Sequence, residues 1–372
     1  MSGIYIHIPF CRSKCIYCAF YSRVAVQPLC ASFKEALTAE ILARRGEIPR
    51  GVETIYFGGG TPSLLEPSFY SELLGVIGSL LPEGSDALKE ITLEVNPEDI
   101  DEEKAGEWAA AGINRVSMGV QSFHDSTLRK IGRRHSSAKI YEAFGILSRY
   151  FSNISIDLIC GLPETESMWE KSVDEAVSLG AKHLSVYMLE NEPGSALHRL
   201  WRAGKISLPG EEETAERFRQ ACLRIREAGY WQYEISNFAQ PGFESVHNSS
   251  YWRSEPYIGF GPSAAGFDGI AKRRVNSPDI IPYINNVGNP PHDIEILSPE
   301  QQRIEFLLTR IRTREGIPVD EFASRFGKKC TADLLSAASG FVESGKMTFG
   351  SGCLSLTQEG IFIEDYILAH LV

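Results

Sequence analysis

Near its N-terminus the chain carries an apolar run that leads into three closely spaced cysteines, Gly3-Ile4-Tyr5-Ile6-His7-Ile8-Pro9-Phe10-Cys11-Arg12-Ser13-Lys14-Cys15-Ile16-Tyr17-Cys18. The apolar residues before the proline predict a β-strand. The cysteines, in the pattern CxxxCxxC, then lie in the loop at the end of this strand. Three thiolates so close in sequence can face a single centre, so this loop is the first site to consider for a metal or a cluster.

The spacing favours an iron–sulfur cluster over the other uses of cysteine. Structural zinc almost always takes four protein ligands, usually as two distant half-sites, and no second half-site follows. A cube of four irons accepts thiolates readily, and three of them leave one iron open for a small molecule. Cysteines that only pack do not explain this spacing beside Lys14 and aromatic residues. A zinc-stabilised interaction module is kept as a remote alternative.

The composition is that of a globular protein. The 372 residues allow one large domain and a smaller one, and 43% apolar with 23% charged residues is ordinary. The net charge of −11 argues against nucleic acid or an anionic membrane as a partner, because both require a basic face. No apolar run approaches the length of a bilayer span, so we expect no stable membrane insertion. Because no leader segment precedes the cysteines, the expected location is a reducing cytoplasm.

After the cysteine loop, predicted helices and strands alternate. This order predicts a parallel α/β sheet with right-handed crossovers, curled into a barrel or part of one. In such barrels the chemistry collects at the C-terminal ends of the strands. The predicted strands are 52–57, 90–95, 115–120, 153–159 and 183–189, and the predicted helices are 31–45, 67–81, 102–111, 137–150 and 168–179.

Polar and glycine residues follow several of these strands. Gly58-Gly59-Gly60-Thr61-Pro62 ends the strand 52–57. Glycines there let backbone amides approach a ligand, although a tight turn explains the same residues. Later strand ends carry Glu94, Gln121, Asp157 and Glu190. Each could be a solvated strand-end residue, but one that is buried needs a partner.

The segment Tyr5-Ile6-His7-Ile8-Pro9-Phe10-Cys11, the cysteine triplet and the aromatic Tyr17 resemble the radical S-adenosylmethionine (SAM) enzymes, in particular the oxygen-independent coproporphyrinogen III oxidase group. The resemblance recurs along nearly the whole chain. It implies an α/β fold with a partial (β/α)6 radical SAM barrel over 1–210 and a barrel extension over 211–297. Beyond it, predicted helices at 298–312, 319–326 and 331–344, a short hairpin of 346–349 and 354–356 and a final helix from Gln358 resemble a winged-helix-like module. They predict a small C-terminal α+β domain over 298–372. DNA binding by that domain is not expected, because the protein is acidic and the domain lacks a basic recognition helix.

The resemblance also implies two cofactors. Cys11, Cys15 and Cys18 would hold a 4Fe-4S cluster, and the open iron would chelate SAM, which such enzymes reduce to a 5′-deoxyadenosyl radical. Gly59, Gly60 and Thr61 match the stretch that contacts the SAM amino group. Arg133 matches the arginine that pairs with the SAM carboxylate, a bidentate role that suits a guanidinium. The other SAM-binding residues implied in this way are Tyr5, Tyr17, Glu94, Gln121, Asp157, Met188 and Ala265. No residue receives a catalytic role.

The segment His247-Asn248-Ser249-Ser250-Tyr251-Trp252 suggests a third ligand. A lone histidine beside aromatic residues is more often structural than a ligand. Histidine is also an ordinary axial ligand of haem iron, and Tyr and Trp can cover a porphyrin face. The pattern HNxxYW resembles a hallmark of the haem chaperone branch of this family. It makes His247 the leading haem-ligand candidate, with His7 and His135 as lesser axial candidates.

Two sequence features favour that branch over the oxidases. Oxidases of the family carry an N-terminal extension and a fourth cysteine in CxxxCxxCxC, whereas this chain has Phe20 at that position and its cluster strand stands at the start. The favoured function is therefore a chaperone that binds haem and hands it to haem proteins. Radical decarboxylation of coproporphyrinogen III to protoporphyrinogen IX is the alternative, so the question of enzymatic activity stays open.

Several properties are not specified by the sequence. The recipient haem protein is unknown, haem attachment could be covalent or axial, and a homodimer is compatible with the sequence. The remaining cysteines have no paired spacing, so we expect them to be buried as small apolar residues. They are Cys30, Cys160, Cys222, Cys330 and Cys353.

Overall fold

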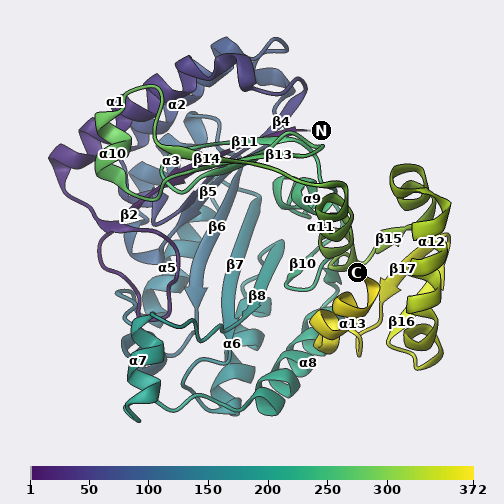
Figure 1. Cartoon of the computed structure of the whole chain (residues 1–372). Helices are drawn as coiled ribbons and strands as arrows, with labels where there is room; N and C mark the ends of the chain where they lie inside the picture. Colours follow the sequence, from purple (N-terminus) through teal and green to yellow (C-terminus); the bar gives the residue numbers. More distant parts are fainter. Residues whose placement is uncertain (1) are drawn as a thin grey trace.

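The computed structural model describes residues 2–372, and at its centre lies one sheet of twelve strands (Figure 1). Its strands are β1 (Ser2–Ile8), β4 (Val52–Gly59), β5 (Glu90–Val95), β6 (Arg115–Gln121), β7 (Asn153–Cys160), β8 (His183–Met188), β9 (Trp231–Gln232), β10 (Asn237–Ala239), β11 (Tyr257–Phe260), β12 (Ala265–Phe267), β13 (Lys272–Asn276) and β14 (His292–Ile296). Most of the central strands are buried on both faces, which their near-continuous apolar residues allow.

The sheet order is β14-β13-β12-β11-β1-β4-β5-β6-β7-β8-β10-β9. From β11 to β8 each neighbouring pair is parallel, and antiparallel strands finish both edges. Within residues 2–372 the end strands β14 and β9 do not pair with each other. The sheet is therefore an open, partial barrel, and the predicted α/β fold class is confirmed.

Helices cover the outside of this curved sheet (Figure 1). They are α1 (Gln27–Ala43), α2 (Pro67–Leu80), α3 (Glu102–Ala110), α4 (Asp125–Lys130), α5 (Ser137–Leu147), α6 (Glu166–Ser178), α7 (Ala196–Arg202), α8 (Glu211–Glu227), α9 (Val246–Trp252) and α10 (Ile280–Asn285). In α2 the side chains of Phe69, Leu73 and Ile77 are buried, four residues apart on one face. Neighbouring helices pack on one another, α1 on α2, α2 on α3, and α6 on α8.

Some predicted helix ends are wrong by a few residues. Helix α1 ends at Ala43 and its C-cap is Arg44, whereas the predicted helix ends at residue 45. The Arg44 guanidinium donates to the buried Glu40 carboxylate at 2.6 Å, so the last turn is fixed by an ion pair. Gly46 lies in the short 3-10 turn Arg45–Glu47 that follows.

The C-terminal part is a small α+β unit with its own apolar core. It contains α11 (Pro299–Ile311), β15 (Ile317–Pro318), α12 (Val319–Glu343), β16 (Met347–Gly350), β17 (Cys353–Leu356) and α13 (Glu364–Leu371). Phe306, Phe322 and Leu334 are buried together there. The positive φ of 86° at Gly327 breaks α12 into two helices, in agreement with the two predicted segments. The last helix begins at Glu364, later than the predicted Gln358.

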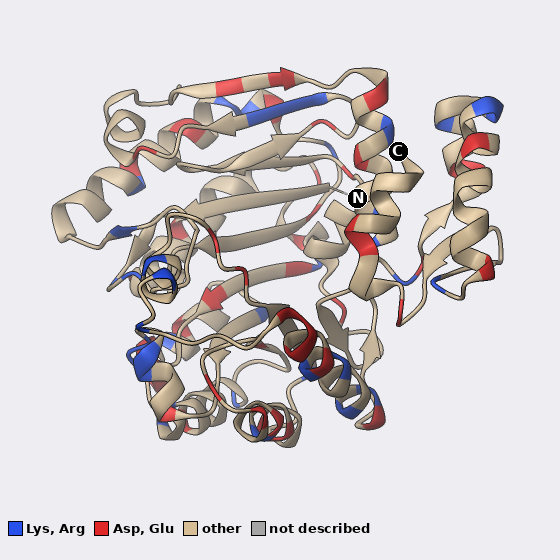
Figure 2. Ribbon diagram, turned by 60° about the horizontal axis from the view of Figure 1, so that its bottom comes forward, with Lys and Arg blue, Asp and Glu red and all other residues tan. Residues whose placement is uncertain are grey.

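Charged residues are distributed over the exterior. In the view of Figure 2, segments rich in Lys and Arg alternate with segments rich in Asp and Glu over the outer helices, while the central strands are mostly uncharged. Where β13 and β14 pair, Arg273 lies opposite Glu295. Among residues 2–372, no helix combines the length and apolarity needed to cross a membrane.

Candidate functional site

A cavity of about 490 Å³ runs from the C-terminal ends of the parallel strands into the interior of the partial barrel. We refer to it as the first cavity. The predicted site residues that line it are Cys11, Cys15, Tyr17, Cys18, Gly59, Gly60, Thr61, Glu94, Gln121, Arg133, Asp157 and Met188. Residues more than a hundred positions apart thus meet in one place, because parallel strands end at the same edge of the sheet.

The cysteine loop forms one wall of the first cavity. It lies between the two-residue strands β2 (Phe10–Cys11) and β3 (Arg23–Val24), which pair in parallel. Thr61 Oγ1 donates to Cys11 Sγ at 3.5 Å, and Arg133 Nη1 lies 3.9 Å from Cys15 Sγ. Burial raises the pKa of the Cys18 thiol.

These thiols fit an iron–sulfur cube better than a single metal ion. Within residues 2–372, no three His, Cys, Asp or Glu side chains are close enough to hold one metal ion. A cube has no such requirement, because each thiolate binds a different iron. The Thr61 hydroxyl beside Cys11 and the Arg133 guanidinium beside Cys15 are hydrogen-bond donors of the kind that tune the reduction potential of a cluster.

The backbone N–H groups of the GGGTP loop are used inside the protein. Gly59 N donates to Glu94 Oε2 at 3.1 Å, Gly60 N to Ile8 O at 2.8 Å, and Thr61 N to Phe10 O at 2.7 Å. A Cβ at Gly60 would lie 2.5 Å from Phe10 O, so this glycine is required by chain packing. In this conformation these amides therefore have partners within the protein. The loop can offer oxygen acceptors, which suit an ammonium group.

Glu94 lies at the end of β5 and is held on both carboxylate oxygens. Tyr56 Oη donates to Oε1 at 2.8 Å, and the Gly59 amide donates to Oε2. Burial is the main reason that the pKa of Glu94 rises to about 7, and the nearby Asp157 carboxylate adds to the effect. This acid can therefore accept or hold a proton near neutral pH.

Asp157 and Gln121 lie on neighbouring strands. Ser117 Oγ donates to Asp157 at 2.9 Å and Ser155 Oγ at 3.1 Å, while burial raises the pKa of this carboxyl. Gln121 has a positive φ of 71° and follows a register shift between β6 and β7. Such irregularities re-aim side chains beside functional sites. Gln121 lines the first cavity at this point.

Arg133 connects the cysteine loop to the strand ends. Its Nη2 donates to Asn96 Oδ1 at 2.6 Å and also to the carbonyl of Gly119. Its Nε is buried and has no hydrogen-bond partner among the described residues. A buried guanidinium N–H without a partner is costly, and a carboxylate in the cavity would satisfy it.

Two of the implied SAM-binding residues lie outside the lining of the first cavity. Tyr5 lies on β1, with its hydroxyl 3.0 Å from His7 Nδ1 and its ring stacked on Tyr56. Ala265 lies on β12 and packs closely against Gly259, whose Cβ would be 2.0 Å from the Ala265 carbonyl oxygen. Tyr5 contacts the cavity wall through Tyr56, whereas β11 separates the strand of Ala265 from β1.

His247 is completely buried, with 0% of its surface exposed, and does not line the first cavity. Its Nδ1 lies 2.8 Å from Thr54 Oγ1 and its Nε2 lies 2.7 Å from Tyr251 Oη. Burial lowers the pKa of His247 to about 3, so the ring is neutral. Both nitrogens are engaged, and in this conformation neither is free to bind iron.

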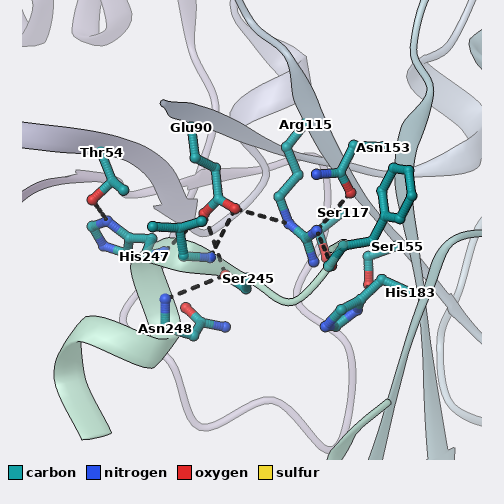
Figure 3. A network of polar contacts seen from close by, with 12 residues as sticks. Thr54, Glu90, Arg115, Ser117, Asn153, Ser155, His183, Ser245, His247 and Asn248 are labelled. Atoms are coloured by element: carbon teal, nitrogen blue, oxygen red, sulfur yellow. Dashed lines mark hydrogen bonds and ion pairs between the residues drawn. The ribbon is translucent and has the colours of Figure 1, made fainter. Parts of the chain in front are cut away.

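A buried polar network holds the helix that carries His247 (Figure 3). Glu90 accepts hydrogen bonds from the backbone amides of Val246 and His247, each at 2.9 Å, at the start of α9. A carboxylate at this end complements the helix dipole. On its other side Glu90 lies 4.0 Å from Arg115 Nε, and Arg115 lines the first cavity.

The lesser axial candidates are also engaged. His7 lies between Tyr5 Oη and the carbonyl of Tyr21, and burial lowers its pKa to about 4. His135 Nδ1 lies 3.0 Å from Glu98 and its Nε2 lies 3.3 Å from the Val120 carbonyl. Each of these histidines therefore has a structural role in this conformation.

The sequence did not identify several residues of the first cavity. Asn96 donates to Thr61 Oγ1 at 3.2 Å and accepts from Arg133, so it joins two predicted parts of the site. Its position directly after a strand was an available signal. No comparable signal exists for residues deep in the barrel, because inward-facing polar residues look like ordinary strand residues in sequence. These residues are Tyr56, Arg115, Ser117, His183 and Ser185.

Comparisons with known proteins agree with this architecture. The profile of the radical SAM superfamily matches residues 5–176, and that of the HemN C-terminal domain matches residues 297–363. The solved structure of coproporphyrinogen III oxidase (HemN) from Escherichia coli has a TM-score of 0.85 at 22% identity, covering 100% of this chain and 89% of that chain. At this identity the likeness shows the shared fold.

Two curated relatives are closer in sequence. The "Heme chaperone HemW" of Bacillus subtilis (strain 168) is 36% identical over 375 residues, covering 99% of this chain and 98% of its own length. The mitochondrial "Radical S-adenosyl methionine domain-containing protein 1" of Danio rerio is 33% identical, covering 85% of this chain and 74% of its own length. The chain therefore belongs to the radical SAM superfamily and, within its HemN-like family, to the branch of the proteins named heme chaperone HemW.

Proposed function

We propose that the protein is a haem chaperone, which binds haem and delivers it to haem proteins. The observation that carries this proposal is the similarity along 99% of the chain to the Bacillus subtilis heme chaperone HemW. The pattern HNxxYW, which forms helix α9 with His247 and Ser250 buried, and Phe20 in place of a fourth cysteine support the same branch.

The proposal includes the two cofactors of the superfamily. Cys11, Cys15 and Cys18 would hold the 4Fe-4S cluster, and Arg133 would bind the SAM carboxylate through its unpartnered Nε. Oxygen acceptors of the GGGTP loop would receive the SAM amino group, and Glu94 would accept from sugar hydroxyls. When bound, the cluster and SAM supply reductive cleavage to a 5′-deoxyadenosyl radical. The remaining SAM-site assignments, including Tyr5 and Ala265, are part of this proposal.

The proposal also covers the cellular location of the protein, its recipient and its oligomeric state. We place the activity in the cytoplasm, because a cluster held by thiolates needs reducing conditions and all eight cysteines, each within residues 2–372, are free thiols. A recipient haem protein and a homodimer belong to the same proposal. Light scattering of the reconstituted protein, with and without haem, would measure the oligomeric state.

One anaerobic experiment tests the function. The iron-reconstituted protein is titrated with haem, and the same preparation is incubated with reductant, SAM and coproporphyrinogen III before product analysis. The expected result is stoichiometric haem binding without decarboxylation.

Formation of protoporphyrinogen would instead make the protein an oxidase. This alternative is worth the assay because the cluster cysteines and most implied SAM-binding residues line one cavity. Absence of haem binding and of decarboxylation would contradict both functions.

A further inference from the structure

A second cavity, of about 480 Å³, lies between the edge of the large sheet and the C-terminal unit. It is formed by α9, by β11, β12 and β13, and by α11 and the first part of α12. Figure 1 shows α9 and α11 beside each other. Its volume falls in the range of sites for cofactors and drug-sized ligands. It shares no lining residue with the first cavity.

Aromatic rings dominate the lining of the second cavity. They come from different elements, which brings several flat apolar surfaces to one place. The aromatic lining residues are Tyr251, Trp252, Tyr257, Phe267, Phe306 and Phe326. The indole N–H of Trp252 is buried and has no hydrogen-bond partner within residues 2–372. A wide, flat and largely apolar ligand fits such walls.

The charged lining consists of two arginines and one glutamate, Arg273, Arg325 and Glu305. Arg273 pairs with Glu305 and lies 3.8 Å from Glu295. Arg325 pairs with Glu321 at 2.9 Å and stands over the Phe306 ring. Each guanidinium also has N–H donors beyond those its acidic partners take, so each can donate to a further carboxylate. Haem presents two propionates together with its flat ring.

Tyr257 supplies an oxygen atom suited to iron. Its hydroxyl has no hydrogen-bond partner among the described residues, and the charges that act on it are those of Arg273 and Glu305, both in the lining. Burial raises the pKa of Tyr257, and the Arg273 guanidinium offsets part of this rise. Tyrosinate is one of the axial ligands that proteins use for haem iron.

His247 lies between the two cavities. One face of its ring stacks on Tyr56, which lines the first cavity, at a centroid distance of 5.1 Å. Its Nε2 lies 2.7 Å from the hydroxyl of Tyr251, whose ring packs edge-on against Tyr257 at 4.5 Å. The contacts of His247 with the second cavity therefore pass through Tyr251.

We propose that the second cavity is the haem site, with Tyr257 as the axial ligand of ferric iron and Arg273 and Arg325 as partners of the propionates. His247 is then a positioning residue, which holds Tyr251 against Tyr257. When the phenol oxygen binds iron, the O–H bond breaks and the proton passes to solvent. This inference rests on the proposed haem-binding function, because it names the site at which that function occurs.

The test is an anaerobic titration of ferric haem into the full-length, cluster-reconstituted protein, followed by absorption and electron paramagnetic resonance spectra. Tyr257→Phe keeps the ring and removes only the oxygen. We expect it to weaken haem binding by about tenfold or more and to abolish the tyrosinate signature. The matched control is Tyr187→Phe, which removes a hydroxyl from the lining of the first cavity and should leave haem binding unchanged.

Two further comparisons separate the role of the arginine charges from the role of His247 in positioning Tyr251. The double variant Arg273→Gln, Arg325→Gln should weaken haem binding, whereas Arg274→Gln, on the other face of β13, should not. His247→Gln should lower the affinity and retain the tyrosinate signature. Loss of a histidine signature in His247→Gln would overturn the assignment of Tyr257.

The outcomes distinguish this inference from the function on which it rests. If the parent protein binds no haem, the proposed function fails and the site with it. If the parent binds haem and Tyr257→Phe behaves like the parent, the function stands and the second-cavity site is wrong. Weaker binding in Tyr187→Phe alone would place haem in the first cavity. Iron content and SAM binding of Tyr257→Phe, which should equal those of the parent, show that the variant is folded.

Discussion

The first and second cavities have nearly equal volumes, about 490 and 480 Å³, but different chemistry. The first is lined by thiols, carboxylates and arginines at and below the ends of parallel strands. The second is lined by aromatic rings and two arginines between the sheet edge and the C-terminal unit. The volume of a cavity therefore does not indicate which ligand it binds. The residues that line each cavity decide this.

The difference also concerns how each cavity is built. The register of β1, β4, β5, β6 and β7 fixes the first cavity, and inter-strand hydrogen bonds hold its wall. The second lies where α11 packs on α9 and where the first part of α12 adds to the lining beside β11. The walls of the second cavity therefore come from two separately packed units, whereas those of the first come from one sheet and its loops.

The largest expected effect comes from removing the cluster ligands. Replacement of Cys11, Cys15 and Cys18 by alanine should abolish cluster iron and SAM cleavage, since no nearby side chain replaces three thiolates. Haem affinity at the second cavity should stay within a few-fold. Iron analysis and haem titration measure the two effects, and Cys30→Ala, outside both cavities, is the control. Loss of haem binding together with the iron would show that the two cavities are coupled.

The next effect concerns Glu94 and pH. Its folded pKa of about 7 lies above its ordinary value of 4.5, so between these pH values the folded protein holds a proton that the unfolded chain has lost. The free energy of unfolding should therefore fall as the pH rises from about 4.5 to 7, by up to about 3 kcal/mol from this group. Glu94→Gln should remove this part of the slope.

Urea unfolding of the SAM-free protein at pH 5 and pH 8 measures the contribution of Glu94. The same comparison in Glu305→Gln, which changes a carboxylate of the second cavity, serves as the control. An unchanged pH slope in Glu94→Gln would contradict the burial argument.

A smaller effect is expected at Arg133. A charge-assisted hydrogen bond contributes about 1.5–3 kcal/mol, so Arg133→Ala should weaken SAM binding by about 10- to 100-fold. Arg129→Ala, exposed and outside the cavity lining, should leave SAM binding unchanged. Equilibrium dialysis with SAM under anaerobic conditions gives the affinities. Equal affinities of the two variants would remove Arg133 from the SAM site.

The smallest effect is expected at Phe20, the residue that distinguishes this chain from the CxxxCxxCxC pattern. Its side chain is 69% exposed at the rim of the first cavity. Phe20→Cys should therefore change iron content and haem affinity by less than about twofold, because exposed substitutions rarely alter packing. If the Phe20→Cys variant decarboxylated porphyrinogen measurably, Phe20 would be the residue that determines which activity the protein has.

Much of the first cavity could be predicted from the sequence. CxxxCxxC is a local pattern, and Glu94, Gln121 and Asp157 lie in the C-terminal parts of strands whose apolar runs are recognisable. Once the strands are parallel, their ends meet, so positions distant in sequence become neighbours. Inward-facing residues such as Arg115 and His183 could not be recognised, because an alternating strand gives no sign of which polar side chain faces a cavity.

The sequence by itself determined the cysteine loop, the alternating α/β order, the strand-end residues and the separate C-terminal segment, because each depends on local spacing and periodicity. Only the tertiary structure decided that the GGGTP amides are used internally and that His247 is buried with both nitrogens bonded. It alone brought Tyr257, Arg273 and Arg325 to one cavity. Those facts depend on which side chains meet after the sheet edge, α9 and the C-terminal unit pack together, and no local pattern encodes that packing.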